Sequence, residues 1–246
     1  MAGRIRGVFF DLGDTLLNFG HVDVLGLFES GARLAYAYLQ SMGKALPSFA
    51  DYHRRQLWAV RWGYLKSRLT GREFDARARI DLMGRKMGHH LTEQQIDELA
   101  WLWYEPLSRC ASIENDLPET LAQLSAGRTL GLISNTFIPA SALDRHLKQL
   151  GLLDRLPIRV YSCDVHCRKP HPAIFRAAME RAGLAAAETV FVGDSPGADI
   201  TGAHRAGMIS VLKDPIGRHA RGNVRANHTI ARLSELRAIV AGYEGA

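Results

Sequence analysis

The sequence has little cysteine and no long apolar run, and each shortage excludes a class of protein. Only three of its 246 residues are cysteines, Cys110, Cys163 and Cys167. This odd, low count argues against a disulfide framework and predicts a reducing, cytoplasmic setting. No segment approaches the roughly 18 uninterrupted apolar residues of a membrane helix. The first residues also lack the layout of a secretory signal. We therefore expect a cytoplasmic protein with no membrane partner.

Clustered charge is missing as well. The net charge is +6, but the arginines are spread along the chain instead of gathering in one run. Such a spread is typical of a solvated basic surface, so we expect no nucleic-acid partner. The composition favours a small anionic partner and leaves a monomer or a homodimer equally open.

Short apolar runs alternate with amphipathic stretches over most of the chain, which predicts strands alternating with helices. The expected strands are Ile5–Phe10, Thr129–Ile133, Ile158–Ser162, Thr189–Val192 and Ile209–Leu212. The expected helices are Leu117–Ala126, Ala140–Leu150, Ala173–Ala182, Ala198–Ala206 and Ile230–Ala241. This alternation indicates an α/β fold with a doubly wound, Rossmann-like parallel sheet that is covered on both faces.

The segment after the first strand is different, because it contains helical patterns only. We expect four helices there, near Val24–Met42, Ser48–Leu69, Glu73–Met87 and Glu93–Ser108. Thr92 and Gln95 form a capping box at the start of the last one. The predicted organisation is a core domain of residues 1–17 and 111–246, with a helical cap domain of residues 18–110 inserted over its ligand edge.

Polar residues follow the expected strands at the points where the strands end. Asp11 follows the first strand, Ser134 the second and Asp194 the fourth, while Lys169 precedes the helix after the third. Because ligands bind at the carboxyl ends of parallel strands, we expect these residues to share one crevice. Asp11 is suited to nucleophilic attack and Asp194 to binding Mg²⁺. Ser134, the amides after it and Lys169 are suited to phosphoryl oxygens.

Four segments carry a resemblance to a known family. VFFDLGDTL, LISN, RKPHPAIF and VFVGDSPGADITGAHRAGM resemble the four motifs of the haloacid dehalogenase-like hydrolases. The insert at residues 18–110 resembles the type-one helical cap of that family, as in its phosphoglycolate phosphatase-like members. The resemblance spans nearly the whole chain. It implies a phosphatase that acts on a small phosphorylated metabolite.

The resemblance also implies roles for individual residues. Asp11 would attack phosphorus and form an aspartyl-phosphate. Mg²⁺ would be bound by Asp11, the main-chain carbonyl of Gly13, and Asp194. The groups implied to hold the phosphoryl oxygens are Ser134, the Asn135 amide and Lys169. Asp199 would orient Lys169 or a metal-bound water.

Position 13 departs from the family pattern. The phosphatases of the family usually carry an aspartate there, which protonates the leaving group and then activates the hydrolytic water. Gly13 can do neither, and the loss of a general acid–base typically costs about 10²–10⁴-fold in rate. Three explanations stay open: a good leaving group, replacement by Asp14, or a slow phosphatase whose main role is another. Asp14 itself is better explained as a carboxylate that caps a turn.

The second expected cap helix carries an aromatic and basic face. Spacing of three to four residues places Trp58, Arg61 and Trp62 on one side of that helix. They are candidates for binding the body of the substrate. The alternative is that both tryptophans pack in the core of the cap and that Arg61 is solvated.

Three other functions stay open. Haloacid dehalogenases also lack the second aspartate but use no metal, and they do not usually keep the motif around Asp194 and Asp199. Phosphonate hydrolases need a lysine from the cap, for which Lys44 and Lys66 are candidates. A non-catalytic member would keep the site for binding anions or for regulation.

Overall fold

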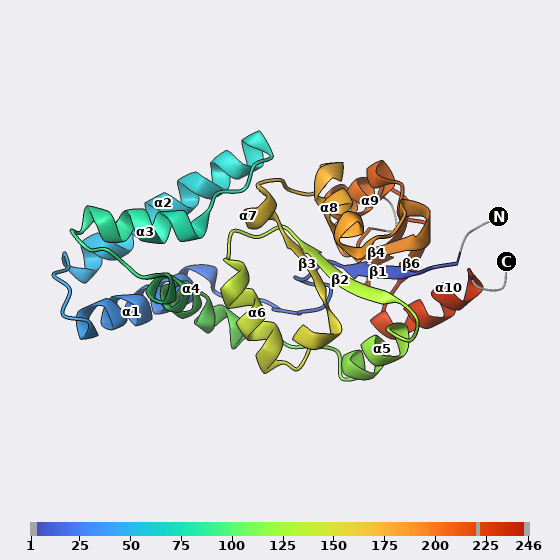
Figure 1. Cartoon of the computed structure of the whole chain (residues 1–246), viewed down its shortest axis with the longest axis horizontal. Coiled ribbons are helices and arrows are strands. Elements are labelled where there is room, and N and C mark those ends of the chain that lie inside the picture. The colour runs from blue at the N-terminus through green and yellow to red at the C-terminus, as the bar shows by residue number, and fades with distance from the viewer. Residues whose placement is uncertain (1–3, 220–221, 244–246) are drawn as a thin grey trace.

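The computed structural model describes residues 4–219 and 222–243. Its centre is a parallel sheet, in which these residues form strands in the order β3-β2-β1-β4-β5-β6 (Figure 1). The strands are β1 (Gly7–Phe10), β2 (Thr129–Ser134), β3 (Ile158–Tyr161), β4 (Thr189–Gly193), β5 (Ile209–Lys213) and β6 (His228–Ile230). The five expected strands are confirmed to within two residues at each end.

Helices cover both faces of the sheet. One face carries α5 (Leu117–Leu124), α6 (Ala140–Gln149) and α10 (Leu236–Gly242), and the other carries α8 (Pro172–Ala182) and α9 (Thr201–Ala206). Successive side chains of β1 point to opposite faces, as the pleat of a strand requires. Val8 and Phe10 pack in the first layer and Phe9 in the second. The doubly wound architecture expected from the sequence is therefore confirmed.

Two expected helices are only partly correct. The stretch Ile230–Ala241 was expected to be one helix, but its first residue ends β6, which pairs with β5 at the edge of the sheet. A short turn, Leu233–Glu235, then leads into α10. A strand of three residues is too short to show a period of two. Similarly, a single π-helical turn, Pro196–Ile200, precedes α9.

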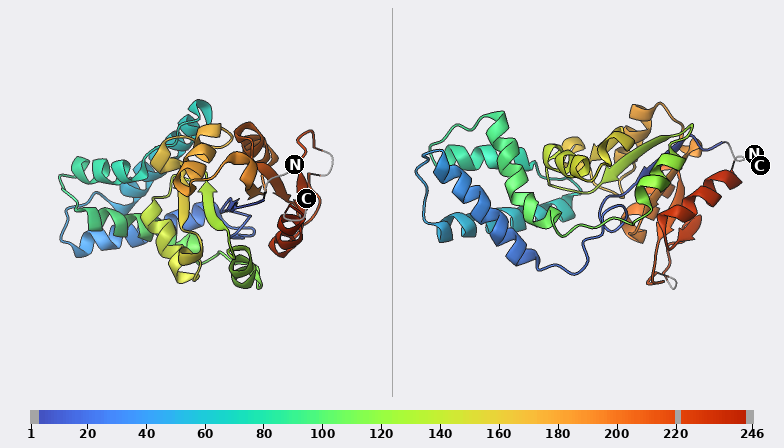
Figure 2. Two further views of the ribbon diagram at one scale, coloured as in Figure 1. Left: turned by 45° about the vertical axis from the view of Figure 1, so that its right-hand side comes forward. Right: turned by 90° about the horizontal axis from the view of Figure 1, so that it is seen from below.

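The insert forms the four expected helices: α1 (Val24–Ser41), α2 (Phe49–Thr70), α3 (Ala76–Lys86) and α4 (Glu93–Ser108). We call α1–α4 the cap helices. They lie beside the sheet, away from α10 (Figure 2), and α4 packs both on α1 and on α6 of the core. The capping box of Thr92 and Gln95 is confirmed. The exact domain boundaries stay a prediction. No helix of the described residues is both long and apolar enough to cross a membrane.

Candidate active site

Two carboxylates meet at the ends of neighbouring strands. Asp11 follows β1 and Asp194 follows β4, and these two strands pair in register. The main-chain amide of Asp11 donates a hydrogen bond to the carbonyl of Val192 at 2.8 Å, which fixes the end of β1 against β4. Together with Asp199, the two residues offer carboxylate oxygens that all lie within 4.8 Å of one another. The structure thus brings together three acids that the sequence places as much as 188 positions apart.

Lys169 bridges two of these acids. Its ammonium Nζ lies 2.6 Å from Asp11 Oδ1 and 2.7 Å from Asp199 Oδ1, and it donates to the carbonyl of Ile133 at 2.9 Å. Only 2% of its side chain is exposed. A buried ammonium is stable when charged partners and a carbonyl satisfy all its donors. Asp11 and Lys169, which the sequence analysis expected in one crevice, are therefore in direct contact.

Asn135 holds the main chain of Lys169. Its side-chain oxygen accepts from the Lys169 amide at 2.7 Å, and its side-chain nitrogen donates to the Lys169 carbonyl at 3.0 Å. The peptide bond from Lys169 to Pro170 is cis. The sequence motif indicated a role only for the Asn135 amide, so this positioning role of the side chain was missed. The nearby Ser134 hydroxyl makes no hydrogen bond to another described residue and is available to a ligand.

Asp199 reaches Lys169 because residue 193 is a glycine. A Cβ atom at Gly193 would stand 2.3 Å from the Asp199 carboxyl carbon, which no side chain could tolerate. The second oxygen, Oδ2, accepts a hydrogen bond from the amide of Ser195 at 2.9 Å. Oδ2 of Asp199 is thus held by a main-chain donor, and Oδ1 is held by the ion pair with Lys169. This arrangement favours the orienting role for Asp199 over direct metal binding.

The acids and the lysine shift one another's pKa values. Burial raises the pKa of Asp11 to about 7, with Asp199 and Asp194 adding to the rise and Lys169 opposing it. Burial and the charges of Asp199 and Asp14 also raise the pKa of Asp194. For Lys169, burial acts to lower the pKa, but Asp11 and Asp199 outweigh it and the pKa rises. Lys169 therefore stays charged inside a cluster whose acids outnumber it.

Several oxygen atoms of the site that have no strong protein donor are suited to binding a hard cation. No described residue donates a hydrogen bond to Asp11 Oδ2 or to the Gly13 carbonyl. Asp194 has one long contact, from the hydroxyl of Thr15 at 3.5 Å. Carboxylate and carbonyl oxygens are the protein ligands that Mg²⁺ prefers. The residues present thus match the metal set that the resemblance implies: Asp11, Gly13 and Asp194.

The loop after β1 is fixed by a lysine that sequence reasoning missed. Lys213, at the end of β5, donates to the carbonyl of Thr15 at 2.7 Å and pairs with Glu114 at 2.8 Å. Asp14 adopts the left-handed conformation, with φ of 54°, which aspartate tolerates better than most residues. Its side chain is exposed. These features are typical of a turn residue, although Asp14 lies close enough to Asp194 to raise the pKa of that group.

Position 13 has room for a side chain. A Cβ atom built on Gly13 would meet nothing nearer than the ring of Phe19, at 3.9 Å. Gly13 is also absent from the glycines with positive φ among the described residues. The backbone therefore does not require glycine here, and an aspartate could be introduced without strain.

A contact between cap and core lies directly beside Lys169. The segment between α2 and α3 brings Glu73 against Arg168, with which it forms an ion pair. Glu73 also accepts from the hydroxyl of Ser162 at 3.1 Å, and the Arg168 amide donates to the carbonyl of Gly71 at 3.2 Å. No part of the Glu73 side chain is exposed. We call this contact the Glu73–Arg168 latch.

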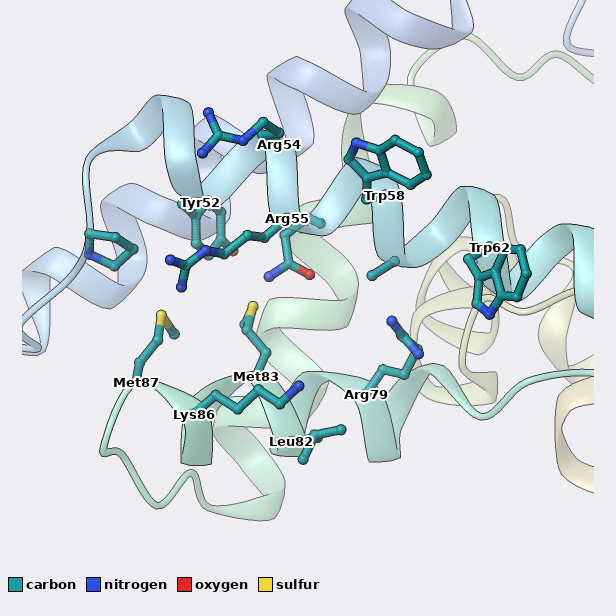
Figure 3. Close-up of a pocket in the computed structure, with 13 residues that line it drawn as sticks. Tyr52, Arg54, Arg55, Trp58, Trp62, Arg79, Leu82, Met83, Lys86 and Met87 are labelled. Atoms are coloured by element: carbon teal, nitrogen blue, oxygen red, sulfur yellow. The ribbon is translucent and has the colours of Figure 1, made fainter.

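The predicted substrate residues of the cap lie on its surface. Trp58 and Trp62 are 69% and 64% exposed, so the alternative that they pack in the cap core is wrong. Both line a cavity between α2 and α3 (Figure 3). Arg61 is exposed and does not line that cavity. Their role in substrate binding stays a prediction.

Comparison with known proteins supports the interpretation of the site. The sequence model of the haloacid dehalogenase-like hydrolase family, described as a hydrolase, matches residues 5–207. This match includes the first three motif segments, all but the last residue of the fourth, and the cap helices. The chain belongs to the haloacid dehalogenase-like hydrolase family.

Relatives of this hydrolase include enzymes of more than one chemistry. It is 31% identical over 210 residues to a phosphoglycolate phosphatase of Yersinia pseudotuberculosis, covering 82% of this chain and 78% of the relative. Among solved structures, a phosphatase of the family from Thermococcus onnurineus has 28% identity and a TM-score of 0.63, over 97% of this chain and 99% of that one. A 2-haloacid dehalogenase from Pseudomonas syringae has 25% identity, the same TM-score and the same two coverages.

Proposed function

We propose that this hydrolase is a Mg²⁺-dependent phosphatase that acts on a small phosphorylated metabolite through an aspartyl-phosphate on Asp11. The observation that carries the proposal is the grouping of Asp11, Asp194 and Asp199 around Lys169. Asp194 has no strong protein partner, so a cation is the natural partner for it. The similarity to phosphoglycolate phosphatase over most of the chain supports phosphorus as the centre attacked.

The residues divide the reaction between them. Asp11 forms a bond to phosphorus through a carboxylate oxygen while the bond from phosphorus to the leaving oxygen breaks. The Ser134 hydroxyl donates to a phosphoryl oxygen, and the nearby charge of the Lys169 ammonium stabilises the negative charge of the phosphoryl group. Asp199 and Asn135 position Lys169 from its two ends. Mg²⁺, when bound, would offset the repulsion between Asp11 and the anionic substrate.

The alcohol that leaves must take up a proton, and Gly13 has none to give. We propose that this step limits the rate and that the enzyme is slow unless its substrate has a good leaving group. Water then attacks the aspartyl-phosphate, releasing phosphate and regenerating Asp11. Asp14 is one residue away and is the candidate substitute, although its conformation also suits a simple turn.

The test is a panel of phosphorylated metabolites incubated with the protein and Mg²⁺. Phosphate release should require Mg²⁺ and should fall at least about 10³-fold in Asp11→Asn. The matched control is Asp154→Asn, an exposed carboxylate in the turn before β3 and outside the Lys169 cluster. If Asp11→Asn released phosphate as fast as the unmodified protein, nucleophilic catalysis by Asp11 would be excluded.

A dehalogenase is the second candidate, and Gly13 together with the Pseudomonas syringae structure favours it. Dehalogenation of a 2-haloacid would also begin with attack by Asp11, but on carbon, with halide leaving without a proton. A metal chelator distinguishes the phosphatase from the dehalogenase. Halide release that persists in a metal chelator would support the dehalogenase, whereas phosphate release abolished by the chelator would support the phosphatase.

A further inference from the structure

The cap carries a cavity that the catalytic site does not account for. It has a volume of about 650 Å³, within the range of about 300–1,000 Å³ typical of small-molecule sites. It opens between α2 and α3, and its lining comes only from residues 47–62 and 79–87. None of the four motif segments contributes to it. The cavity is therefore separate from the carboxylate cluster.

The charge of this cavity is entirely positive. Four cations and no acid line it: Arg54, Arg55, Arg79 and Lys86. Arg54 is paired with Asp51 at 2.5 Å. The side chains of the other three make no hydrogen bond or ion pair with any residue in the described part of the chain. Figure 3 shows Arg55 and Arg79 reaching from facing helices into the gap. Cations held together in this way repel one another unless an anion lies between them.

The cavity also offers aromatic surface. Trp58 and Trp62 lie along the α2 side, one helical turn apart, and Leu82 and Met83 line the α3 side. Neighbouring exposed tryptophans form an apolar patch, and such patches are typical of surfaces that bind a ligand or a partner. Indole faces suit the stacking of flat rings. The cavity thus combines groups that recognise anions with groups that recognise an aromatic body.

We propose that this cavity is a second ligand site, which binds a small organic polyphosphate carrying a flat ring, the chemical class of nucleoside di- and triphosphates. The phosphates lie between Arg55, Arg79 and Lys86, and the ring stacks on a tryptophan. A nucleic-acid strand fits less well, because the cations come from two helices that face each other across a gap instead of following a line. The site is independent of the proposed catalytic function.

The test is equilibrium binding of ADP, followed by tryptophan fluorescence and calorimetry. Buffer with a metal chelator keeps the carboxylate cluster free of Mg²⁺. We expect ADP to saturate one site. Arg79→Glu should weaken ADP binding at least about tenfold, because it places an anion where a phosphate lies. Trp62→Ala should weaken it about tenfold by removing the stacking surface.

Arg68→Glu is the matched control, because Arg68 is an exposed arginine of α2 outside the cavity lining. It should change ADP affinity less than about twofold, as a distant exposed charge is screened by salt. Lys86→Glu is a second test variant on α3, in case Arg79→Glu folds poorly. Thermal melts establish that each variant is folded.

Four outcomes would overturn the proposal. ADP could fail to saturate any site at millimolar concentration, or Arg68→Glu could weaken binding as much as Arg79→Glu. A single-stranded oligonucleotide could bind more tightly than ADP with the same dependence on Arg79 and Trp62, which would assign the surface to nucleic acid. Finally, sedimentation could show a dimer that Arg79→Glu dissociates, which would make the cavity an interface between two copies.

Discussion

Lys169 in the core and the arginines of the cap cavity are cations in opposite surroundings. Lys169 is 2% exposed and has three oxygen partners within 3 Å. Arg55 and Arg79 have no ion-pair partner among the described residues, and they face a cavity. Folding therefore fixes the ammonium of Lys169 in one geometry, whereas the guanidinium groups of Arg55 and Arg79 stay available to a ligand. Lys169 is therefore a cation whose oxygen partners are already in place. Arg55 and Arg79 are cations that line a cavity and have room for an anionic ligand.

Removal of the core cation should have the largest effect. Lys169→Met leaves Asp11 and Asp199 as buried carboxylates without a counter-charge, which typically costs about 3–5 kcal/mol of stability. We also expect a loss of about 10³-fold in phosphate release, since the phosphoryl group loses the positive charge beside it. Urea unfolding and a phosphate assay measure both effects.

ADP binding to the cap cavity is the internal control for Lys169→Met. If the two regions are independent, the variant should bind ADP with unchanged affinity. Retention of more than about a tenth of the hydrolytic rate would mean that Lys169 supports the fold alone.

An aspartate at position 13 should change hydrolysis at the site in the core and leave the cap cavity unchanged. Gly13→Asp restores a carboxyl group where related phosphatases carry one, and the Cβ position is open. Hydrolysis of a poor leaving group, such as an alkyl phosphate, should rise about 10²-fold. A good leaving group, such as a nitrophenolate, should gain much less, because it needs no proton.

The pattern across leaving groups is what decides the role of Gly13. A series of aryl and alkyl phosphates assayed at constant pH gives the dependence of rate on leaving-group pKa. That dependence should flatten in Gly13→Asp. Equal slopes in the two proteins would show that another group, such as Asp14, already supplies the proton.

The smallest effect is a difference in pH dependence between the two regions. Because the pKa of Asp11 is raised to about 7, this carboxyl holds a proton in the folded, metal-free protein at mildly acid pH. Its folded-state pKa lies above its unfolded value, so the free energy of unfolding of the metal-free protein falls as pH rises from about 4 to 7.

Mg²⁺ must displace that proton, so its affinity should rise about tenfold between roughly pH 5.5 and pH 7.5. Calorimetry in two buffers of different ionisation enthalpy would detect the released proton. The cap arginines do not titrate over this range, so ADP binding there should change only through the terminal phosphate of ADP, whose second pKa is about 6. A Mg²⁺ affinity independent of pH would show that Asp11 is not a ligand.

Much of the core could be predicted because its signals are local. Asp11, Ser134 and Asp194 each follow a buried apolar run, and the rule that parallel strands end at one edge brings them together. The cap helices could also be predicted from local features, namely the helical spacing of apolar residues and the capping box at Thr92. β6 was missed because three residues cannot display a strand period.

Contacts between distant segments could not be predicted in the same way. Glu73 and Arg168 are 95 positions apart, and no spacing rule connects a cap turn with a core loop. For Trp58 and Trp62, helical periodicity places both on one face of α2 but does not say which face is buried. The structure buries Gly63 and Ser67 instead and leaves the tryptophans outside.

The Glu73–Arg168 latch has a consequence for how the cap can move. Any swing that lifts the turn after α2 from the core must part this ion pair and pull a wholly enclosed carboxylate into water. The same swing must separate the rings of Phe74 and Phe137, whose centroids are 5.0 Å apart. Arg168 is bonded directly to Lys169, whose ammonium contacts Asp11, so the contact that closes the cap on the core lies one residue from the cluster of acids.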